Sequence, residues 1–422
     1  DVYKRQNDTA QFVKVDDTLS ALKVKKGEDA VIRVVTKNAQ GNSVPNVPFI
    51  LRREGSKNRQ NAEMINKSIT VINAAGASAR MNSSSSLLYG VTGADGTTSF
   101  TVKQDDSMGL VTNMYAQLYQ LTIESNKLPV MFTVITSPDT PLASYWGHMS
   151  ETFTTRSGIA FKRPLLTAEH PAGQSTMANN ESWLSLNTAA KNDVSKSDCG
   201  EPYQPLLSEF QELYSEHPNG AIGTDLGLPL TNTWWAYDKI AYANVWYDQS
   251  INLSNGSSSR ALSNTVAFVS CLVNPHAVAA SIKMTSTALD AEKTASNDGR
   301  PSATAAKGTA IRMTVIVRDS GGNLLPGANF NLIRGTALDR AKNRLDSTYD
   351  DLTIVPVTPA GVNMSLYNNG AQALLTTGSD GKATFDVTQN ETYGLATPLT
   401  ATLMRDTTKS ATMDVIFTVI TS

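Results

Sequence analysis

Six aromatic residues lie within fourteen positions and are the best candidates for a binding site: Trp234, Trp235, Tyr237, Tyr242, Trp246 and Tyr247. If this segment is a strand, alternation places Trp234 and Trp235 on opposite faces of its sheet. We expect one of the pair in a core and the other at the surface, because exposed Trp and Tyr side chains are typical of binding hot spots and of stacking on sugars. The alternative is that all six pack inside the domain or under loops.

No residue pattern points to catalysis or to a metal. The chain lacks His-Glu-x-x-His, Gly-x-Ser-x-Gly, a Walker loop and Gly-x-Gly-x-x-Gly. The glycines at positions 220, 223 and 227 follow no predicted strand and precede no Lys-Ser or Lys-Thr pair, so we interpret them as part of a loop. The four histidines are scattered: His148, His170, His217 and His276. The sequence therefore predicts no catalytic residue, no metal ligand, no cofactor and no enzyme activity.

Two cysteines, Cys199 and Cys271, are the only ones in the chain. They could be two buried thiols of a cytosolic protein or the two halves of a disulfide. Because there is no Cys-x-x-Cys, neither a redox motif nor a zinc ribbon is supported. A disulfide closing a loop of this length would contribute about 4 kcal/mol by chain entropy. It would also indicate an oxidising compartment.

Composition excludes several classes of protein. Lys and Arg number 36 and Asp and Glu 38, which gives a formal net charge of −2. A nucleic-acid binder or a polybasic membrane-surface protein would need a basic face. Hydrophobic residues make up 40% of the chain, so it is not disordered. The longest apolar runs, such as 129–135 and 266–273, are far shorter than the roughly 18 residues of a transmembrane helix.

An internal repeat organises the chain. Phe132-Thr-Val-Ile-Thr-Ser137 recurs as Phe417-Thr-Val-Ile-Thr-Ser422, and the same offset of 285 relates Asp95-Gly96 to Asp380-Gly381. It also relates Lys57-Asn-Arg59 to Lys342-Asn-Arg344. Further upstream the offset is 281, as between Pro45 and Pro326. We therefore expect a four-residue insertion directly after Leu332, and two copies of one unit at 12–137 and 278–422.

The repeated unit has the pattern of an all-β domain. The β-branched runs at 30–36 and 310–317 are bounded by turn residues, and the two Asp-Gly pairs are strong hairpin signals. Many short strands at this spacing predict a β-sandwich, with a closed barrel as the alternative. The ordered turn and strand residues, including Gly41-Asn42, Pro45 and Asp95-Gly96, resemble the immunoglobulin-like (Ig-like) repeats of invasin- and intimin-type bacterial surface adhesins.

The segment 138–277 between the copies has a different composition. All five Trp, all four His and both Cys lie within it, which marks a separate domain. The pattern predicts helices at 180–191 and 209–215, the latter capped by Ser208, followed by strands at 233–236, 243–247, 251–253 and 265–271. This is an α+β domain with a small antiparallel sheet.

Ordered motifs in this segment resemble the C-type-lectin-like domain of the same adhesins. They include Tyr145-Trp-Gly-His148, His217-Pro-Asn-Gly220 and Phe268-Val-Ser-Cys271. The resemblance implies a disulfide between Cys199 and Cys271. The calcium motifs of sugar-binding C-type lectins are missing, so the resemblance implies binding without calcium.

The sequence thus predicts a mainly β protein in which two Ig-like β-sandwich repeats flank one α+β C-type-lectin-like domain. Residues 1–11 are excluded from the fold, because the opening residues look like an assembly scar. The resemblance implies a fragment of an extracellular adhesin, with spacer repeats and a domain that binds a protein or glycan partner on a host or other cell surface. It also implies anchorage through a missing outer-membrane region, and we expect another such domain after Ser422.

Two other functions stay open. One is a purely structural stalk, and the other is a carbohydrate-active enzyme with Ig-like accessory domains. The enzyme would need two carboxylates about 5–10 Å apart in a cleft, and no such Asp or Glu pair is evident on the expected sheet. We expect neither nucleic-acid binding nor direct membrane insertion.

Overall fold

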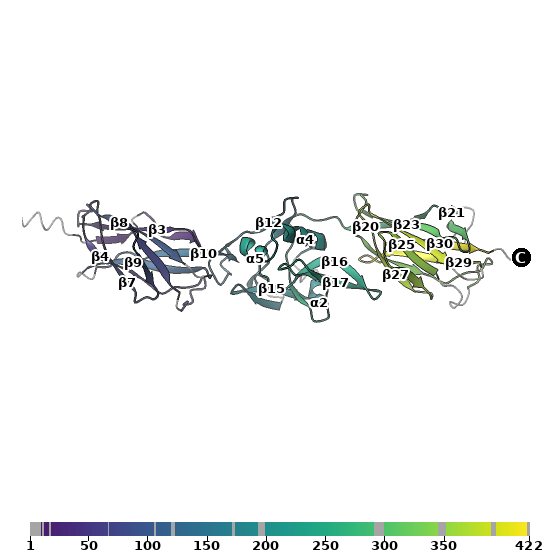
Figure 1. The fold of residues 1–422 in the computed structure, drawn as a ribbon, viewed down its shortest axis with the longest axis horizontal. Coiled ribbons are helices and arrows are strands. Elements are labelled where there is room, and N and C mark those ends of the chain that lie inside the picture. The colour runs from purple at the N-terminus through teal and green to yellow at the C-terminus, as the bar shows by residue number, and fades with distance from the viewer. Residues whose placement is uncertain are drawn as a thin grey trace, which may run out of the picture.

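The computed structural model describes residues 10, 12–16, 18–65, 67–104, 107–119, 123–170, 174–192, 199–290, 299–344, 352–389 and 394–419. The chain forms three bodies in a row along one long axis, with a sandwich at each end and a mixed α and β body between them (Figure 1). The prediction that residues 1–11 lie outside the fold, with an assembly scar at their start, concerns residues that, apart from residue 10, lie outside the described part of the chain.

Alternating burial along the strands of the first repeat places one core between two sheets. Phe49, Phe100 and Phe132 are at most 3% exposed and lie between the sheets. One sheet has the order β1 (Phe12–Val15), β3 (Ala30–Lys37), β8 (Thr97–Gln104), β5 (Ile69–Asn73) and β6 (Ser78–Met81). The other has the order β11 (Gly147–Met149), β10 (Leu128–Pro138), β9 (Leu110–Leu118), β4 (Pro48–Arg53) and β7 (Leu87–Val91), and β2 (Leu22–Lys25) also pairs with β10.

The second repeat reproduces this arrangement. Its first sheet has the order β20 (Ala279–Ser286), β23 (Ile311–Asp319), β28 (Lys382–Gln389), β25 (Leu352–Thr358) and β26 (Met364–Leu366). Its second has the order β21 (Leu289–Asp290), β22 (Ser302–Ala306), β30 (Ser410–Thr418), β29 (Leu395–Leu403), β24 (Asn329–Arg334) and β27 (Gln372–Thr376). The predicted fold of two Ig-like sandwiches is confirmed, and the two separate sheets exclude a closed barrel.

Strand pairing corrects the predicted position of the insertion. Lys57 forms a bridge with Val111, and the equivalent bridge in the second repeat joins Leu338 to Ala396. Leu338, and not Lys342, is therefore the counterpart of Lys57. The similarity between Lys57-Asn-Arg59 and Lys342-Asn-Arg344 is coincidental, so the offset of 281 persists beyond Leu332 as far as the turn that ends at Arg344.

A buried arginine occupies the same place in both sandwiches. Arg53 and Arg334 are 1% and 0% exposed. Arg53 donates hydrogen bonds to the carbonyl oxygens of Met81 at 2.8 Å and Lys67 at 3.1 Å, and burial lowers its pKa to about 10. Arg334 donates to the carbonyl oxygen of Leu366 at 3.1 Å. Each guanidinium thus links a strand of one sheet to a strand of the other sheet: β4 to β6 in the first repeat and β24 to β26 in the second. Sequence reasoning missed this role.

The middle domain contains one six-stranded sheet. Its order is β14 (Gln174–Ala178), β15 (Glu181–Asn187), β19 (Val266–Phe268), β16 (Trp234–Tyr242), β17 (Val245–Ile251) and β18 (Ser258–Arg260). β16 and β19 are parallel, so the sheet is mixed and not purely antiparallel as predicted. The remaining elements are β12 (Thr152–Thr154), β13 (Ala160–Lys162), η1 (Thr167–Glu169), α2 (Thr188–Asn192), η2 (Glu201–Tyr203), α4 (Leu207–Glu216) and α5 (Ala221–Leu226).

Two helix predictions in this domain need correction. Residues 181–187 form strand β15, and the predicted helix at 180–191 is reduced to α2. Trp183 packs into one core and Leu184 and Leu186 into another, so burial on both faces of the strand imitated a helical pattern. Helix α4 is confirmed, but Leu206 and not Ser208 is its N-cap, and the Glu209 carboxylate accepts the Leu206 N–H at 2.8 Å. The predicted loop at 220–227 contains α5.

Candidate adhesion surface and domain junctions

The two central tryptophans lie on opposite faces of β16, and both are buried. Trp234 is 0% exposed and packs against Phe268, with ring centroids 5.2 Å apart. Trp235 is 3% exposed, and its Nε1 donates to the carbonyl oxygen of Leu186 at 2.8 Å. The expectation that one of the pair is exposed is wrong, because a second apolar cluster with Leu184 covers the other face of the sheet.

Tyr237 belongs to the junction with the second repeat. The Arg405 guanidinium lies 3.6 Å from the centroid of its ring, and its hydroxyl donates to the Glu201 carboxylate at 2.6 Å. Arg405 also donates to the carbonyl oxygen of Tyr237. Burial raises the pKa of the Tyr237 phenol. This ring therefore holds two domains together and offers little surface to a partner.

Trp246 contributes to the same junction from the β16–β17 hairpin. Its Nε1 donates to the Asn331 Oδ1 at 2.6 Å, and the Asn329 amide donates to the Lys239 carbonyl oxygen at 3.4 Å. Beside these contacts the two domains leave a cleft of about 510 Å³, with Leu325 and Met404 among its lining residues. The second repeat thus supports one face of the hairpin without sealing against it.

The opposite face of the hairpin is open. Ile240 pairs with Tyr247 across the two strands and Tyr242 pairs with Val245, so these four side chains share one face. Arg260 lies over them, with its guanidinium 3.7 Å from the ring centroid of Tyr242 and 5.1 Å from that of Tyr247. Tyr242 is 53% exposed. We call these five residues the aromatic face.

A two-residue turn orients the aromatic face. Ala243 and Asn244 join β16 to β17 with φ values of 48° and 60°. Positive φ at both positions is typical of a type I′ turn, whose twist matches that of the paired strands. Sequence reasoning missed Ile240, Val245 and Arg260, whose part in the face depends on strand register.

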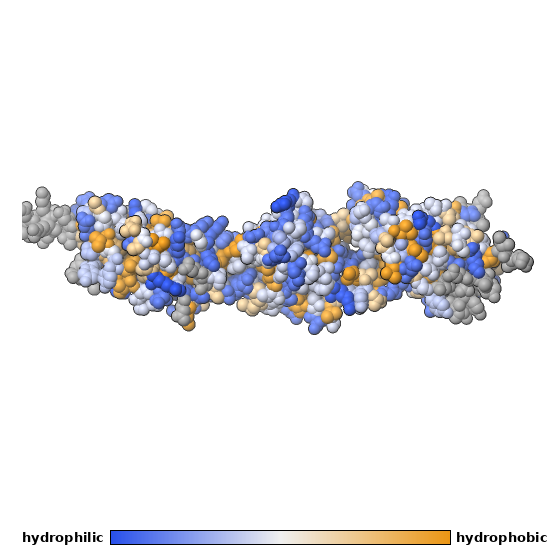
Figure 2. Space-filling model, viewed as in Figure 1, coloured by the Kyte–Doolittle hydropathy of each residue, from blue (hydrophilic) through white to orange (hydrophobic). Residues whose placement is uncertain are grey.

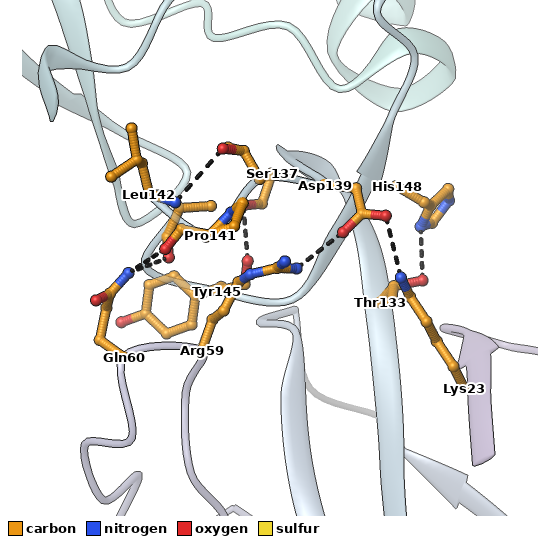
Figure 3. Close-up of polar contacts among 12 residues, drawn as sticks. Lys23, Arg59, Gln60, Thr133, Ser137, Asp139, Pro141, Leu142, Tyr145 and His148 are labelled. Carbon is orange, nitrogen blue, oxygen red and sulfur yellow. Dashed lines mark hydrogen bonds and ion pairs between the residues drawn. The ribbon is translucent and has the colours of Figure 1, made fainter. Parts of the chain in front are cut away.

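The first junction is built around Trp146. The Arg59 guanidinium lies 4.5 Å from the Trp146 ring centroid and donates to the Asp139 carboxylate at 2.8 Å, while Gln60 donates to the Pro141 and Ala143 carbonyl oxygens at 3.0 and 2.7 Å. Figure 3 shows Arg59 and Gln60 reaching from loops of the first repeat to the linker. Lys23 reaches the same Asp139 carboxylate at 3.1 Å.

The junction also relies on close backbone packing. The end of β10 pairs with β11 in parallel, with Val134 opposite Gly147. A Cβ on Gly109 would lie 1.7 Å from the Trp146 carbonyl oxygen, and a Cβ on Gly227 would lie 1.9 Å from that of Ile135. Neither position has room for a side chain, so the sandwich and the middle domain form a continuous contact.

A buried carboxylate fixes the linker from the other side. Glu181 is 1% exposed and accepts the N–H of Ser144 at 2.7 Å and of Tyr145 at 3.1 Å. Burial raises the Glu181 pKa to about 7, against the lowering effect of these N–H donors. Nearby, burial lowers the pKa of His148, whose Nδ1 lies 3.0 Å from the Thr133 hydroxyl.

Two covalent or ionic links hold the middle domain itself. Cys199 and Cys271 form the predicted disulfide, with Cα atoms 5.4 Å apart. Lys191 and Asp248 form a buried ion pair with Nζ and Oδ1 2.6 Å apart. Among the residues that the structure describes, no three His, Cys, Asp or Glu side chains gather as a group able to hold a metal.

The surface carries no single dominant patch on the side drawn in Figure 2, where small apolar areas alternate with polar ones on all three bodies. In the described part of the chain, no helix combines the length and the apolar composition needed to span a bilayer. The aromatic face is therefore a small local feature, distinguished by the stacking of Arg260 on two tyrosine rings and not by its area.

Two Ig-like sandwiches that flank a disulfide-linked α+β domain define a class of cell-surface adhesion proteins. A family model described as "Adhesion domain" matches residues 138–272, and one described as "Bacterial Immunoglobulin-like 21" matches residues 27–135 and 308–420. The chain belongs to the invasin-like bacterial surface adhesins. We refer to the middle domain below as the adhesion domain.

Several solved structures are similar to this chain. The Yersinia pseudotuberculosis adhesin InvE is 26% identical, with a TM-score of 0.51, over 62% of this chain and 69% of that one. The Escherichia coli adhesin FdeC is 9% identical, with a TM-score of 0.26, over 97% of this chain and 96% of that one. The D0-D1 domain of intimin is 10% identical, with a TM-score of 0.18, over 97% of this chain and 98% of that one. A comparison with curated protein sequences finds no match.

Proposed function

We propose that the adhesion domain binds a protein or glycan partner on a host or other cell surface through the aromatic face, without calcium. The two Ig-like repeats act as spacers on either side of it. The proposal includes an extracellular location, with anchorage through an outer-membrane region of a longer protein. Membership of the adhesin family supports the adhesive function. The exposed, stacked side chains of the aromatic face support its choice as the binding surface.

The observation that carries the proposal is the open stack of Tyr242, Arg260 and Tyr247. Tyr242 is 53% exposed, although such a ring usually gains from burial. Arg260 holds both rings in place, so little side-chain freedom is lost on binding. Aromatic and Arg side chains on a rigid element are typical of interface hot spots, and aromatic rings also stack on sugars.

The stalk function remains the second candidate because a specific observation favours it. Tyr237 and Trp246, two of the six predicted binding residues, make their contacts with the second repeat. Trp234 and Trp235 are buried. Most of the cluster therefore stiffens the array, and only Tyr242 and Tyr247 are left to serve a partner.

The experiment compares the full chain with a Tyr242→Ser/Tyr247→Ser variant on a glycan array and on host-cell surfaces. The matched control is Tyr89→Ser, which removes a 64% exposed tyrosine from the first repeat. We expect saturable binding that survives EDTA and Tyr89→Ser and is lost in the double variant. A third variant, Arg260→Gln, is expected to weaken binding by releasing the two rings.

Three outcomes would count against this function. Binding that the double variant retains would exclude the aromatic face, and binding that EDTA abolishes would exclude calcium independence. Absence of binding by a folded, disulfide-linked chain would favour the stalk function. Tryptophan fluorescence checks the fold of the adhesion-domain variants, since all five tryptophans lie in that domain and none is replaced. Hydrogen exchange of the first repeat checks the fold of Tyr89→Ser.

A further inference from the structure

The two repeats can be compared residue by residue at the end of the sandwich where the last strand, β10 or β30, leaves it. The bridges from Lys57 to Val111 and from Leu338 to Ala396 fix the equivalence. Arg340 is then the counterpart of Arg59, and Gly394 is the counterpart of Gly109. In the first repeat this end contacts the adhesion domain. Each residue at the same end of the second repeat can therefore be compared with an equivalent residue of the first junction.

The second repeat keeps the central features of that end. Arg59 lies against Trp146, whereas Arg340 is exposed. The sequence that ends the first repeat, 132–137, is identical to the sequence 417–422 that begins at the end of β30. In the first repeat this closing strand, β10, pairs with β11, and its Val134 N–H donates to the Trp146 carbonyl oxygen at 3.1 Å.

Gly394 is kept without the steric reason that Gly109 has. A Cβ on Gly109 would collide with the Trp146 carbonyl oxygen at 1.7 Å, while the nearest atom to a Cβ on Gly394 is the Phe417 carbonyl oxygen at 3.2 Å. Neither glycine has a positive φ. The backbone conformation therefore does not require glycine at position 394. The 3.2 Å approach to the Phe417 carbonyl oxygen is a tight contact within the repeat, whereas a segment seated like Trp146 would exclude any Cβ.

Peripheral contacts of the first junction are not kept. Lys23 corresponds to Thr304 through the pairing of β2 with β10 and of β22 with β30. Gln60 corresponds to Ala341. The retained set is thus the arginine, the glycine and the strand, which make the central contacts with Trp146, while the outer contacts with the linker differ.

The opposite ends of the repeats do not share this correspondence. The second repeat holds the hairpin through Asn329 and Asn331. Their counterparts in the first repeat are Pro48 and Ile50, which have no side-chain amide. The resemblance is therefore confined to one end and is not a general consequence of the repeat.

We propose that the end of the second repeat formed by Arg340, Gly394 and the closing strand is a docking face for a second adhesion domain of the kind found at 138–272. Its Trp-Gly pair lies over Gly394 and under the Arg340 guanidinium, as Trp146-Gly147 does in the first junction. The interaction is independent of what the aromatic face binds.

The test extends the full chain by placing a copy of residues 138–277 directly after Ser422, which reproduces the connection between Ser137 and Pro138. Hydrogen exchange reports the protection of both linkers, and small-angle scattering reports the rigidity of the whole. We expect the added linker to be protected like the first one. Arg340→Ala or Gly394→Ala should increase its exchange roughly tenfold, and the matched changes Arg59→Ala and Gly109→Ala should affect the first linker only.

Two results would overturn the proposal. One is free exchange of the added linker in the extended chain without substitutions. The other is a Gly394→Ala variant that leaves the added linker protected while Gly109→Ala exposes the first. The unextended chain carrying Gly394→Ala is the control for folding. If it loses stability in the second repeat, the glycine serves its own sandwich and the steric argument fails.

Discussion

The buried pair of Lys191 and Asp248 gives the sharpest test of how the adhesion domain is stabilised. Both side chains are 3% exposed. Burial lowers the Lys191 pKa to about 8. The Asp248 pKa is below its usual range, because Lys191 and the Asn192 amide outweigh the effect of burial. The pair is therefore ionised at neutral pH, and either group would be a buried charge without the other.

The contacts predict unequal costs for the two single changes. In Lys191→Met, Asp248 keeps the Asn192 amide at 2.8 Å and the Lys239 ammonium at 3.9 Å. We expect a loss of about 1–3 kcal/mol in the free energy of unfolding. In Asp248→Ala, Lys191 keeps only the Trp235 ring, 5.6 Å away, among the contacts described here. We expect a loss of about 3–5 kcal/mol.

The assay is denaturant unfolding of the full chain followed by tryptophan fluorescence. Because all five tryptophans lie between 145 and 277, the signal reports the adhesion domain and, through Trp146 and Trp246, its two junctions. A double variant, Lys191→Met/Asp248→Ala, completes the cycle. It should lose less than Asp248→Ala, because no charge is left buried without a partner.

The reasoning is refuted if Lys191→Met costs as much as Asp248→Ala, or if the double variant loses the sum of the single changes. The first result would mean that Asn192 and Lys239 do not support Asp248. The second would mean that the two charges do not interact, although Nζ and Oδ1 are 2.6 Å apart.

Three further changes test the junction, the disulfide and the sandwich core. Between about pH 4.5 and 7, folded Glu181 holds a proton that the unfolded chain has lost, so its contribution to adhesion-domain stability should fall as pH rises through this range. Because the lowered pKa of His148 acts in the opposite direction, the readout is the stability of the wild type minus that of Glu181→Gln, which should fall with pH; a constant difference would contradict the assignment. Replacing Cys199 and Cys271 by alanine should cost the adhesion domain about 4 kcal/mol, read by tryptophan fluorescence, with no effect on the exchange of either repeat. Arg53→Met should remove the arginine donor from the Met81 carbonyl oxygen and leave the Lys67 carbonyl oxygen with the weaker Ser56 hydroxyl contact at 3.3 Å. It should cost the first repeat about 1–3 kcal/mol, measured by hydrogen exchange of β8; unchanged exchange would mean that the carbonyl groups find other partners.

The sequence was sufficient for the sandwich fold, because Asp-Gly turns and alternating strands are local signals. It misplaced the insertion, since the coincidental match of Lys57-Asn-Arg59 with Lys342-Asn-Arg344 outweighed a pairing that only the bridges reveal. The buried Arg53 could not be expected, because arginine is almost never fully buried without a partner. Its partners are three backbone carbonyl groups and the Ser56 hydroxyl, which the sequence does not identify.

The candidate site was predicted in part. The aromatic cluster was visible in the sequence, but its division into core, junction and surface was not. Trp246 contacts Asn331, which is 85 positions away, and Trp235 is covered by a second apolar cluster whose members come from distant segments. Both depend on tertiary packing. The open face of Tyr242 and Tyr247 follows from the register of β16 with β17.

The parallel pairing inside each repeat determines how the chain responds to tension. In the second repeat, β22 runs alongside the closing strand β30, with five residue pairs from Ser302–Asp414 to Ala306–Thr418; in the first, β2 does the same with β10. A pull on the closing strand is directed along this ladder, so its hydrogen bonds are loaded together in shear and do not open one at a time. Resistance to such a pull is set by the unfolding rate more than by equilibrium stability. A cell held by its adhesion domain in a flowing liquid would therefore load each sandwich in its mechanically strong direction.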